Sequence, residues 1–413
     1  MSRVLFVQYT NPAGYPPLQH SSRILADAGW KVLFLGTGAA GADVLAFPAH
    51  RNITVRRMEF CKAGWRQKLH YLRFCLWVFW TALLWRPRWI YASDQLSCPA
   101  ALLLTSLPGR ELIYHEHDSP ASGNTAGGFA GFISRARGTV ARRAQICILP
   151  NEVRLERFRS ELGPLRSAVC VWNCPAREEI AVSPRDPATG PFWVLYHGSI
   201  VPDRLPPSVV DALALLPDSV HLRVAGYETV GSRGYVEQLR QRARALQVEH
   251  RIEFLGSIPQ RADLLAQTMH SDIGLALMPM TSNDWNCETM TGASNKAFDY
   301  LACGLALVVS NRPDWRRMFA EPDNGKPAYG LVCDPGDAVS IAAALRQWIA
   351  DPVSMRHAGE LGRQRIAAEW NYEHLFLPVF RRMSGQPEPL ISSTETSASR
   401  NFGNDNAAQP VPK

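Results

Sequence analysis

The sequence contains no apolar run as long as the ~18 residues that a membrane-spanning helix needs, and no dense tract of lysine and arginine interleaved with aromatic residues. The first absence argues against a spanning segment, and the second argues against nucleic acid as a partner. The nine cysteines follow no regular spacing, so we expect free thiols in a reducing compartment. The opening residues, MSRVLFVQYTNP, form too short an apolar run for a secretory signal. Together these features predict a cytoplasmic protein.

The composition is that of an ordinary globular protein with enough apolar residues for a large core. The chain has 413 residues, of which 46% are hydrophobic and 20% are charged, and this length suits two domains better than one. Lysine and arginine number 44 against 37 aspartates and glutamates, which gives a net charge of +7. A diffuse excess of this kind is typical of a protein that meets phosphates or an anionic surface.

Short apolar and β-branched runs alternate with longer amphipathic segments along most of the chain. This alternation predicts strand–helix–strand units and parallel sheets. A Pro-rich, charged stretch at 173–190 separates two such series and is interpreted as a linker. We therefore expect an α/β protein of two Rossmann-like domains, over residues 1–185 and 190–360, and then a helix over 361–383 that packs back toward the first domain. Residues 384–413 are poor in large apolar side chains and are expected to be disordered.

One segment, GWRQKLHYLRFCLWVFWTALLWRPRW at residues 64–89, is rich in tryptophan, leucine and basic residues. Its apolar part, residues 74–85, is too short to cross a bilayer. One interpretation is a helix buried against a sheet, which is slightly favoured for the apolar part. The other is a basic, aromatic helix that lies against a membrane surface, which would hold the protein at the inner face of the plasma membrane. The sequence leaves both open.

The most informative segment is SNKAFDYLACGLALVVSN, residues 294–311. Ser294 is a suitable N-cap for a helix over 295–303, and Gly304 suits the position after its end. The run LALVVS then predicts a buried parallel strand. The start of such a helix offers free N–H groups and a positive dipole end, which suit a diphosphate.

Two charged residues of this helix strengthen that interpretation. Lys296 lies in the first turn and adds a full positive charge, and Asp299 is three residues further on the same face. A carboxylate there can accept hydrogen bonds from two ribose hydroxyls. A capped helix with a surface lysine and aspartate would explain the same residues, so the segment alone does not decide the matter.

This segment resembles the donor-site motif of the retaining GT-B glycosyltransferases, in particular those of family 4. The resemblance implies two facing Rossmann-like domains, with Lys296 on the donor phosphates and Asp299 on the ribose. Ser294 and Asn295 would form the start of the phosphate-binding helix. One departure is that Thr291 stands where many relatives carry the first of two glutamates.

Other parts of the second series match the same family. The run LYHGSIVPDR, residues 195–204, resembles its first strand and loop, where Gly198 lets the backbone approach a ligand. Arg204 falls where the family places a phosphate-binding lysine, a task that guanidinium also suits. Ser199 replaces a frequent arginine. Gly226, in LRVAGYE, falls in a glycine loop that the resemblance assigns to the donor.

The first series offers residues on the other side of the expected cleft. The loop at 11–17 would face the donor diphosphate and contains Gly14. In ELIYHEHDSP, which resembles a stretch of the acceptor side, His117 and Asp118 are candidates to position the acceptor hydroxyl or accept its proton. His115 and His117 would share one side of a strand and could bind a metal ion. No third ligand stands at a motif spacing, so we expect no metal.

The resemblance implies transfer of a sugar from a nucleoside diphosphate sugar to a hydroxyl of a saccharide or lipid-linked acceptor, in polysaccharide or glycolipid biosynthesis. It also implies retention of configuration, without metal or other cofactor. Lys296 and Arg204 would stabilise the leaving diphosphate. Three alternatives remain. A dehydrogenase is disfavoured because no G-x-G-x-x-G turn follows the first strand. A nucleotide-sugar epimerase of this fold stays open, and Thr291 and Ser199 leave a non-catalytic binding protein open.

Overall fold

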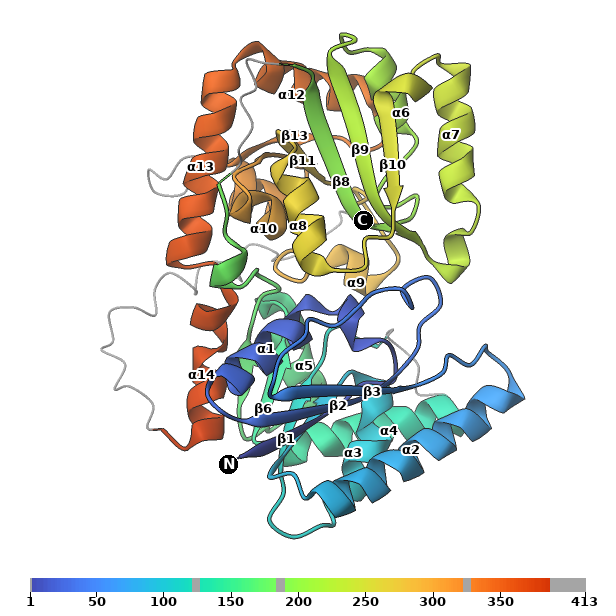
Figure 1. Ribbon diagram of the computed structural model, residues 1–413, viewed down its shortest axis with the longest axis vertical. Helices are drawn as coiled ribbons and strands as arrows, with labels where there is room; N and C mark the ends of the chain where they lie inside the picture. The colour runs from blue at the N-terminus through green and yellow to red at the C-terminus, as the bar shows by residue number, and fades with distance from the viewer. Residues whose placement is uncertain (1, 121–126, 183–189, 322–327, 387–413) are drawn as a thin grey trace, which may run out of the picture.

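The computed structural model describes residues 2–120, 127–182, 190–321 and 328–386. It contains two α/β domains, one above the other in Figure 1, with a cleft between them. Each domain is built on one parallel sheet, so the expected class of two facing Rossmann-like domains is confirmed. The part of the expected disordered tail from 387 to 413 lies outside the described residues.

The N-terminal sheet has seven parallel strands in the order β3-β2-β1-β4-β5-β6-β7. Alternate residues of its central strands point to opposite faces. Leu5 and Val7 pack with α2 to α5, whereas Val4 and Phe6 pack with α1. The strands are β1 Arg3–Val7, β2 Lys31–Thr37, β3 Ile53–Met58, β4 Trp89–Ser93, β5 Glu111–His115, β6 Ile146–Leu149 and β7 Ala168–Cys170. The helices are α1 Pro16–Asp27, α2 Trp65–Trp85, α3 Cys98–Leu104, α4 Gly128–Arg143 and α5 Glu152–Leu162.

The C-terminal sheet has six parallel strands in the order β10-β9-β8-β11-β12-β13. One of its faces packs against α6, α7 and α12, and the other against α8, α10 and α13. The strands are β8 Phe192–Ile200, β9 Val220–Glu228, β10 Ile252–Gly256, β11 Ile273–Ala276, β12 Ala306–Ser310 and β13 Gly330–Cys333. The helices are α6 Ser208–Ala214, α7 Tyr235–Ala245, α8 Arg261–Met269, α9 Trp285–Glu288, α10 Lys296–Ala302, α11 Pro313–Trp315, α12 Ala338–Ala350, α13 Pro352–Ala368 and α14 Tyr372–Ser384.

The helix expected over 361–383 is in fact two helices. Helix α13 runs through residue 361 and packs on the C-terminal domain, whereas α14 lies against the N-terminal domain (Figure 1). Asn371 separates them, since its Oδ1 accepts a hydrogen bond from the His374 N–H at 3.0 Å and caps α14. Tyr372 and Phe376 are buried with Phe6 of the first sheet. The chain therefore closes back on its first domain through α14, the second of these two helices.

Helix α2 has two apolar faces. The inner face, which includes Tyr71, Phe74 and Val78, is buried in the N-terminal core. The outer face is exposed, and Trp65 and Leu84 are 71% and 80% accessible. The interpretation of a helix buried against the sheet is therefore confirmed for the inner face, and contact with a membrane stays a prediction for the outer face. Among the described residues, no helix is both long and apolar enough to span a bilayer.

Candidate active site

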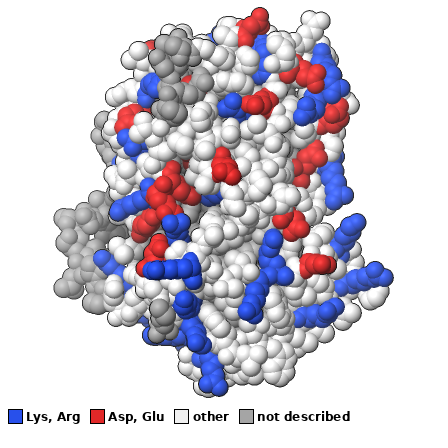
Figure 2. Space-filling view, viewed as in Figure 1, with Lys and Arg blue, Asp and Glu red and all other residues white. Residues whose placement is uncertain are grey.

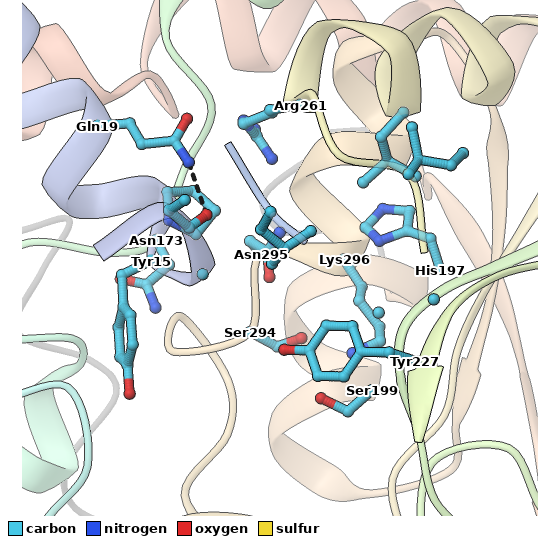
Figure 3. A pocket seen from close by; sticks show the side chains of 18 of the residues that line it. Tyr15, Gln19, Asn173, His197, Ser199, Tyr227, Arg261, Ser294, Asn295 and Lys296 are labelled. Carbon is cyan, nitrogen blue, oxygen red and sulfur yellow. Dashed lines mark hydrogen bonds between the residues drawn. The ribbon is translucent and has the colours of Figure 1, made fainter. Parts of the chain in front are cut away.

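A cavity of about 250 Å³ lies between the two domains, at the carboxyl ends of strands from both sheets. Parallel α/β sheets bind ligands at this edge because strand ends, loops and helix starts meet there. The N-terminal domain contributes the loop after β1 and the loop after β5. The C-terminal domain contributes the ends of β8 and β9 and the start of α10, and Figure 3 labels His197, Tyr227 and Lys296 from these parts. Nine of the residues expected from the sequence line this cleft: Gly14, His117, Asp118, Gly198, Arg204, Gly226, Ser294, Asn295 and Lys296.

Lys296 lies at the start of α10 and is only 4% exposed. Its Nζ stands 5.5 Å from the centre of the Tyr196 ring and against Gly198, where an added Cβ would lie 3.0 Å from it. Burial first, and then the nearby charge of Arg204, lower the pKa of Lys296 to about 7, against the opposing effect of Asp299. A buried ammonium group of this kind gains from an anionic ligand that restores its charge.

The ends of β8 and β9 bring the backbone close to Lys296. Gly198 and Gly226 are paired in register and have φ angles of +111° and +151°, which residues with a Cβ rarely adopt. A Cβ on Gly226 would lie 1.8 Å from the carbonyl oxygen of Gly198. Arg204 follows on the loop after β8, and within the described residues neither Arg204 nor Lys296 forms an ion pair. The cleft therefore holds two cations without a carboxylate partner.

The start of α10 differs in detail from the expectation. Ser294 is not the N-cap; the helix begins at Lys296 and Asn295 is the cap residue, with no side-chain capping bond. The Asn295 side chain donates instead to Asp299 at 2.6 Å. Gly304 has a φ of +75° just after the helix, as the sequence indicated. Ser294 and Asn295 still line the cleft (Figure 3).

Asp299 does not face the cleft, contrary to its expected place at the ribose. Its side chain is fully buried and forms a two-bonded ion pair with Arg261, at 2.7 and 3.1 Å. Arg261 is the first residue of α8, lines the cavity and also pairs with Glu179 of the interdomain linker at 2.6 Å. A carboxylate whose two oxygens already accept hydrogen bonds from a buried guanidinium is poorly placed to accept hydrogen bonds from a ligand's hydroxyl groups. Asp299 therefore positions Arg261, and Arg261 is the residue of this pair that a ligand can reach.

This ion-pair chain reaches the N-terminal domain. Glu179 lies 3.0 Å from His20 of α1. Burial by itself would raise the pKa of Glu179, but the charges of Arg261 and His20 outweigh it and hold that pKa well below its ordinary value. At the other end, burial lowers the pKa of His197 to about 4, so this histidine is neutral near Asp299. These ion pairs therefore join α1, the linker and the C-terminal side of the cleft.

The loop after β5 presents His117 and Asp118 to the cleft. Asp94 shapes it, because its Oδ1 accepts the backbone N–H of His117 at 2.8 Å. Asp94 has a φ of +60°, a strained value for a non-glycine residue that is typical of functional sites. The His117 ring is buried, with Nε2 3.1 Å from Ser93 Oγ, whereas its Nδ1 has no hydrogen-bond partner among the described residues.

The protonation of these two residues is set by their surroundings. Burial lowers the pKa of His117 to about 4, which keeps the ring neutral. The Asp118 side chain lines the cleft and is 65% exposed. Partial desolvation and the charge of Asp94 raise its pKa, against the opposing charges of Arg154, His117 and Arg204. Asp118 is the one carboxylate among the described residues that line the cleft. It is therefore placed to accept a proton.

Arg154 of α5 joins this loop to the C-terminal domain. It is buried and donates to the carbonyl oxygens of His117 at 2.6 Å, Asn286 at 2.9 Å and Thr289 at 3.1 Å. Asn151 donates to Thr289 and Thr291 carbonyl oxygens at 2.7 and 2.9 Å. These bonds fix the loop before α10 against the N-terminal edge of the cleft.

The remaining polar residues of the sequence motifs have structural partners. Glu116 forms a buried ion pair with Arg137, and His115 Nδ1 lies 2.7 Å from Tyr91 Oη. Thr291, which replaces a glutamate of the family pattern, bonds to Asp314 through its hydroxyl and does not line the cavity. No three His, Cys, Asp or Glu side chains of the described ranges are grouped as metal ligands.

Arg261, Arg154 and Asp94 are the site residues that the sequence did not reveal. Each acts through partners far along the chain, so no local spacing marks it. Arg261 is the first residue of α8, a few residues after Ser257 and Ile258, which line the cleft with it.

Comparison with known proteins agrees with this geometry. The model of the glycosyl transferase 4-like domain matches residues 18–174, and that of glycosyl transferases group 1 matches residues 179–365. The glycogen synthase of Mycobacterium tuberculosis is 23% identical over an alignment 435 positions long, which covers 95% of this chain and 98% of the relative.

Solved structures share the fold. HepE of Anabaena, crystallised with UDP and glucose, is 19% identical with a TM-score of 0.68, and the match covers 93% of this chain and all of that one. Sucrose-phosphate synthase of Thermosynechococcus elongatus is 16% identical with a TM-score of 0.65 and the same coverage. The two family models together span both domains and, except for Gly14, the cleft residues described above. The chain therefore belongs to the group 1 glycosyltransferases and has their two-domain GT-B fold.

Proposed function

We propose that this glycosyltransferase takes its sugar from a nucleoside diphosphate sugar and passes it to a hydroxyl of a saccharide acceptor. The main support for this class of donor is a pair of cations, Lys296 and Arg204. Both line the cleft, and neither has a carboxylate partner among the described residues. A buried lysine with a pKa near 7 favours a ligand of high negative charge. A pyrophosphate bound between it, Arg204 and the Gly198 turn satisfies that preference.

The same groups support departure of the nucleoside diphosphate. Negative charge develops on the leaving phosphate oxygen as the glycosidic bond breaks, and preorganised cations stabilise that charge. We propose that Arg261 contacts the nucleoside side of the donor, since it lies beside Ser257 and Ile258 at the edge of the cavity. The neutral His117 offers its unpartnered Nδ1 to a sugar hydroxyl.

On the acceptor side, we propose that Asp118 accepts the proton of the attacking hydroxyl. Its pKa is raised above that of an ordinary aspartate, which makes its carboxylate a stronger base. We propose retention of configuration because the family resemblance implies it. The described cleft presents no second carboxylate to act as a nucleophile on the sugar, so retention would proceed by a same-face displacement. We propose no metal or other cofactor. The free state of all nine cysteines fits the proposed cytoplasmic location.

A donor panel tests this proposal. UDP-glucose is the first candidate, since HepE was crystallised with UDP and glucose, followed by other nucleoside diphosphate sugars. A true donor present at 100 times its Kd stabilises the native state by about 2.7 kcal/mol, which thermal unfolding detects. Lys296→Ala and Arg204→Ala should remove that shift, whereas Arg317→Ala, at an exposed arginine outside the cleft, should keep it.

Product analysis then separates transfer from epimerisation. A transferase releases nucleoside diphosphate in proportion to acceptor, and an epimerase converts the donor without acceptor. The anomeric coupling of the product by NMR reports retention or inversion. If the donor that stabilises the wild type stabilised Lys296→Ala and Arg204→Ala equally, the proposed role of these two cations in donor binding would be refuted.

For the acceptor, we propose a lipid-linked saccharide. The exposed apolar face of α2 supports this choice, because it gives the N-terminal, acceptor-side domain a surface suited to the inner face of the plasma membrane. Transfer to lipid-linked saccharide should exceed transfer to the same saccharide freed from its lipid.

A further inference from the structure

The outer face of α2 carries a continuous apolar stripe. Its members recur at intervals of three and four residues and so share one side of the helix. They are 38% to 80% exposed, far more than core residues, and no described part of the chain covers them. The stripe consists of Trp65, Leu69, Leu72, Leu76, Trp80, Leu83 and Leu84.

The charge of this helix has a single sign. Residues 65–85 include Arg66, Lys68 and Arg73 and no aspartate or glutamate, and all three cations are exposed. On the face seen in Figure 2, the lower, N-terminal domain shows mainly Lys and Arg side chains around a broad uncharged surface. An apolar stripe with tryptophans and a basic border is the pattern of a helix that lies in the interface of an anionic membrane.

A second, independent feature lies at the C-terminal end of the stripe. There Leu84 and Trp85 border a cavity of about 520 Å³ whose wall also includes four cationic residues and no acidic one: Arg3, Lys31, Arg51 and Arg56. Arg3 Nη1 is held by the carbonyl oxygen of Trp85 at 2.6 Å, and Lys31 Nζ by Asn52 Oδ1 at 2.8 Å. None of the four forms an ion pair within the described residues. The cavity therefore places positive charge directly beside the most exposed leucine of the stripe.

We propose that α2 and this cavity form a docking surface for a bilayer of anionic phospholipid. The helix lies parallel to the membrane, with the stripe among the upper acyl chains and glycerol groups. The four cations of the cavity contact a lipid phosphate, and the basic residues of α2 contact neighbouring headgroups. A second copy of this chain is a poorer occupant, because two such faces would bring like charges together.

This docking deepens the lipid-linked acceptor proposed above, since it would hold the acceptor-side domain at the surface where such an acceptor is embedded. The membrane docking depends on the proposed function only for its biological role, and not for the binding itself. Vesicle binding is measured without donor or acceptor, so its failure would leave the proposed transfer intact. Conversely, a protein that bound vesicles but transferred no sugar would refute the transfer alone.

The test is co-sedimentation of the full chain with vesicles of phosphatidylglycerol and phosphatidylcholine in equal parts, compared with vesicles of phosphatidylcholine alone. We expect binding to the anionic vesicles that weakens as salt is raised. The double variant Trp80→Gln, Leu84→Gln and the double variant Arg51→Glu, Arg56→Glu should each lose about tenfold or more in partitioning. Because these side chains are exposed or line an open surface, thermal unfolding should be unchanged.

Matched controls on the C-terminal domain are Val353→Gln, at a residue that is 79% exposed, and Arg317→Glu, at another exposed position. Both should bind as the wild type does. Equal binding to both kinds of vesicle, no binding to either, or unchanged binding of the double variants would overturn the proposal. So would a wild-type dimer in solution that Trp80→Gln, Leu84→Gln converts to monomer, because the stripe would then be a subunit interface.

Discussion

The buried ammonium group of Lys296 should make donor binding depend on pH. In the free enzyme its pKa is about 7, chiefly through burial and then through Arg204. A bound diphosphate favours the charged form, so the pKa in the complex returns toward the ordinary lysine value. The charge that the donor needs is therefore present below pH 7 and is lost from the free enzyme as pH rises through 7. Above that point, binding must take up a proton.

The size of the effect follows from the fraction of charged lysine in the free enzyme. A pKa near 7 leaves about half of the molecules charged at pH 7 and about one in a hundred at pH 9, so the Kd should rise by roughly 50-fold between these values. The diphosphate of a nucleotide sugar does not itself titrate in this range. Proton uptake should grow from about 0.1 per donor at pH 6 to about 0.9 at pH 8.

Isothermal titration calorimetry in two buffers of different ionisation enthalpy measures both quantities. Lys296→Arg is the matched variant, because a guanidinium remains charged throughout. Its larger head will weaken binding next to Gly198, where space is limited, but its Kd should be nearly independent of pH. A wild-type Kd that is constant from pH 6 to pH 9, or an equal slope in Lys296→Arg, would refute this account of the site.

Three further substitutions test other parts of the cleft. Gly226→Ala would place a Cβ 1.8 Å from the Gly198 carbonyl oxygen, so it should lower the free energy of unfolding by about 3 kcal/mol or more and abolish donor binding. Thermal unfolding with and without donor measures both effects. An unaltered melting temperature would contradict the geometry. Arg154→Met should lower the unfolding free energy by about 3 kcal/mol, since buried carbonyl oxygens lose their donors, and hydrogen exchange should increase in the loop before α10 while α12 stays protected. Asp118→Asn should lower kcat by about 10²- to 10⁴-fold with donor Kd changed little, and a normal kcat would remove Asp118 from the proton transfer.

The fold could be predicted from the sequence because its signals are local. The apolar run at Ala306–Ser310 became the buried strand β12. A glycine after a short helix, Gly304, marked the end of α10. Such patterns depend on side-chain period and backbone conformation within a few residues, and the chain carries both whatever its tertiary partners are.

Part of the site could be predicted for a different reason. Lys296, Arg204 and Gly198 lie in segments that resemble a known family, and the structure brings all three to one cavity. The resemblance fixed which strand ends and helix starts would meet, because parallel sheets place them at one edge. It could not fix the partners of each side chain within that edge.

Those partners were decided by the tertiary structure. Asp299 was expected to face the cleft, but Arg261 donates hydrogen bonds to both oxygens of its carboxylate. The apolar residues of α2 could not be divided into buried and exposed sets until the sheet showed which side it covered. The sequence determined the elements through short-range periodicity; packing alone decided which charges neutralise each other and which apolar face stays open, because burial and ion pairing depend on neighbours distant along the chain.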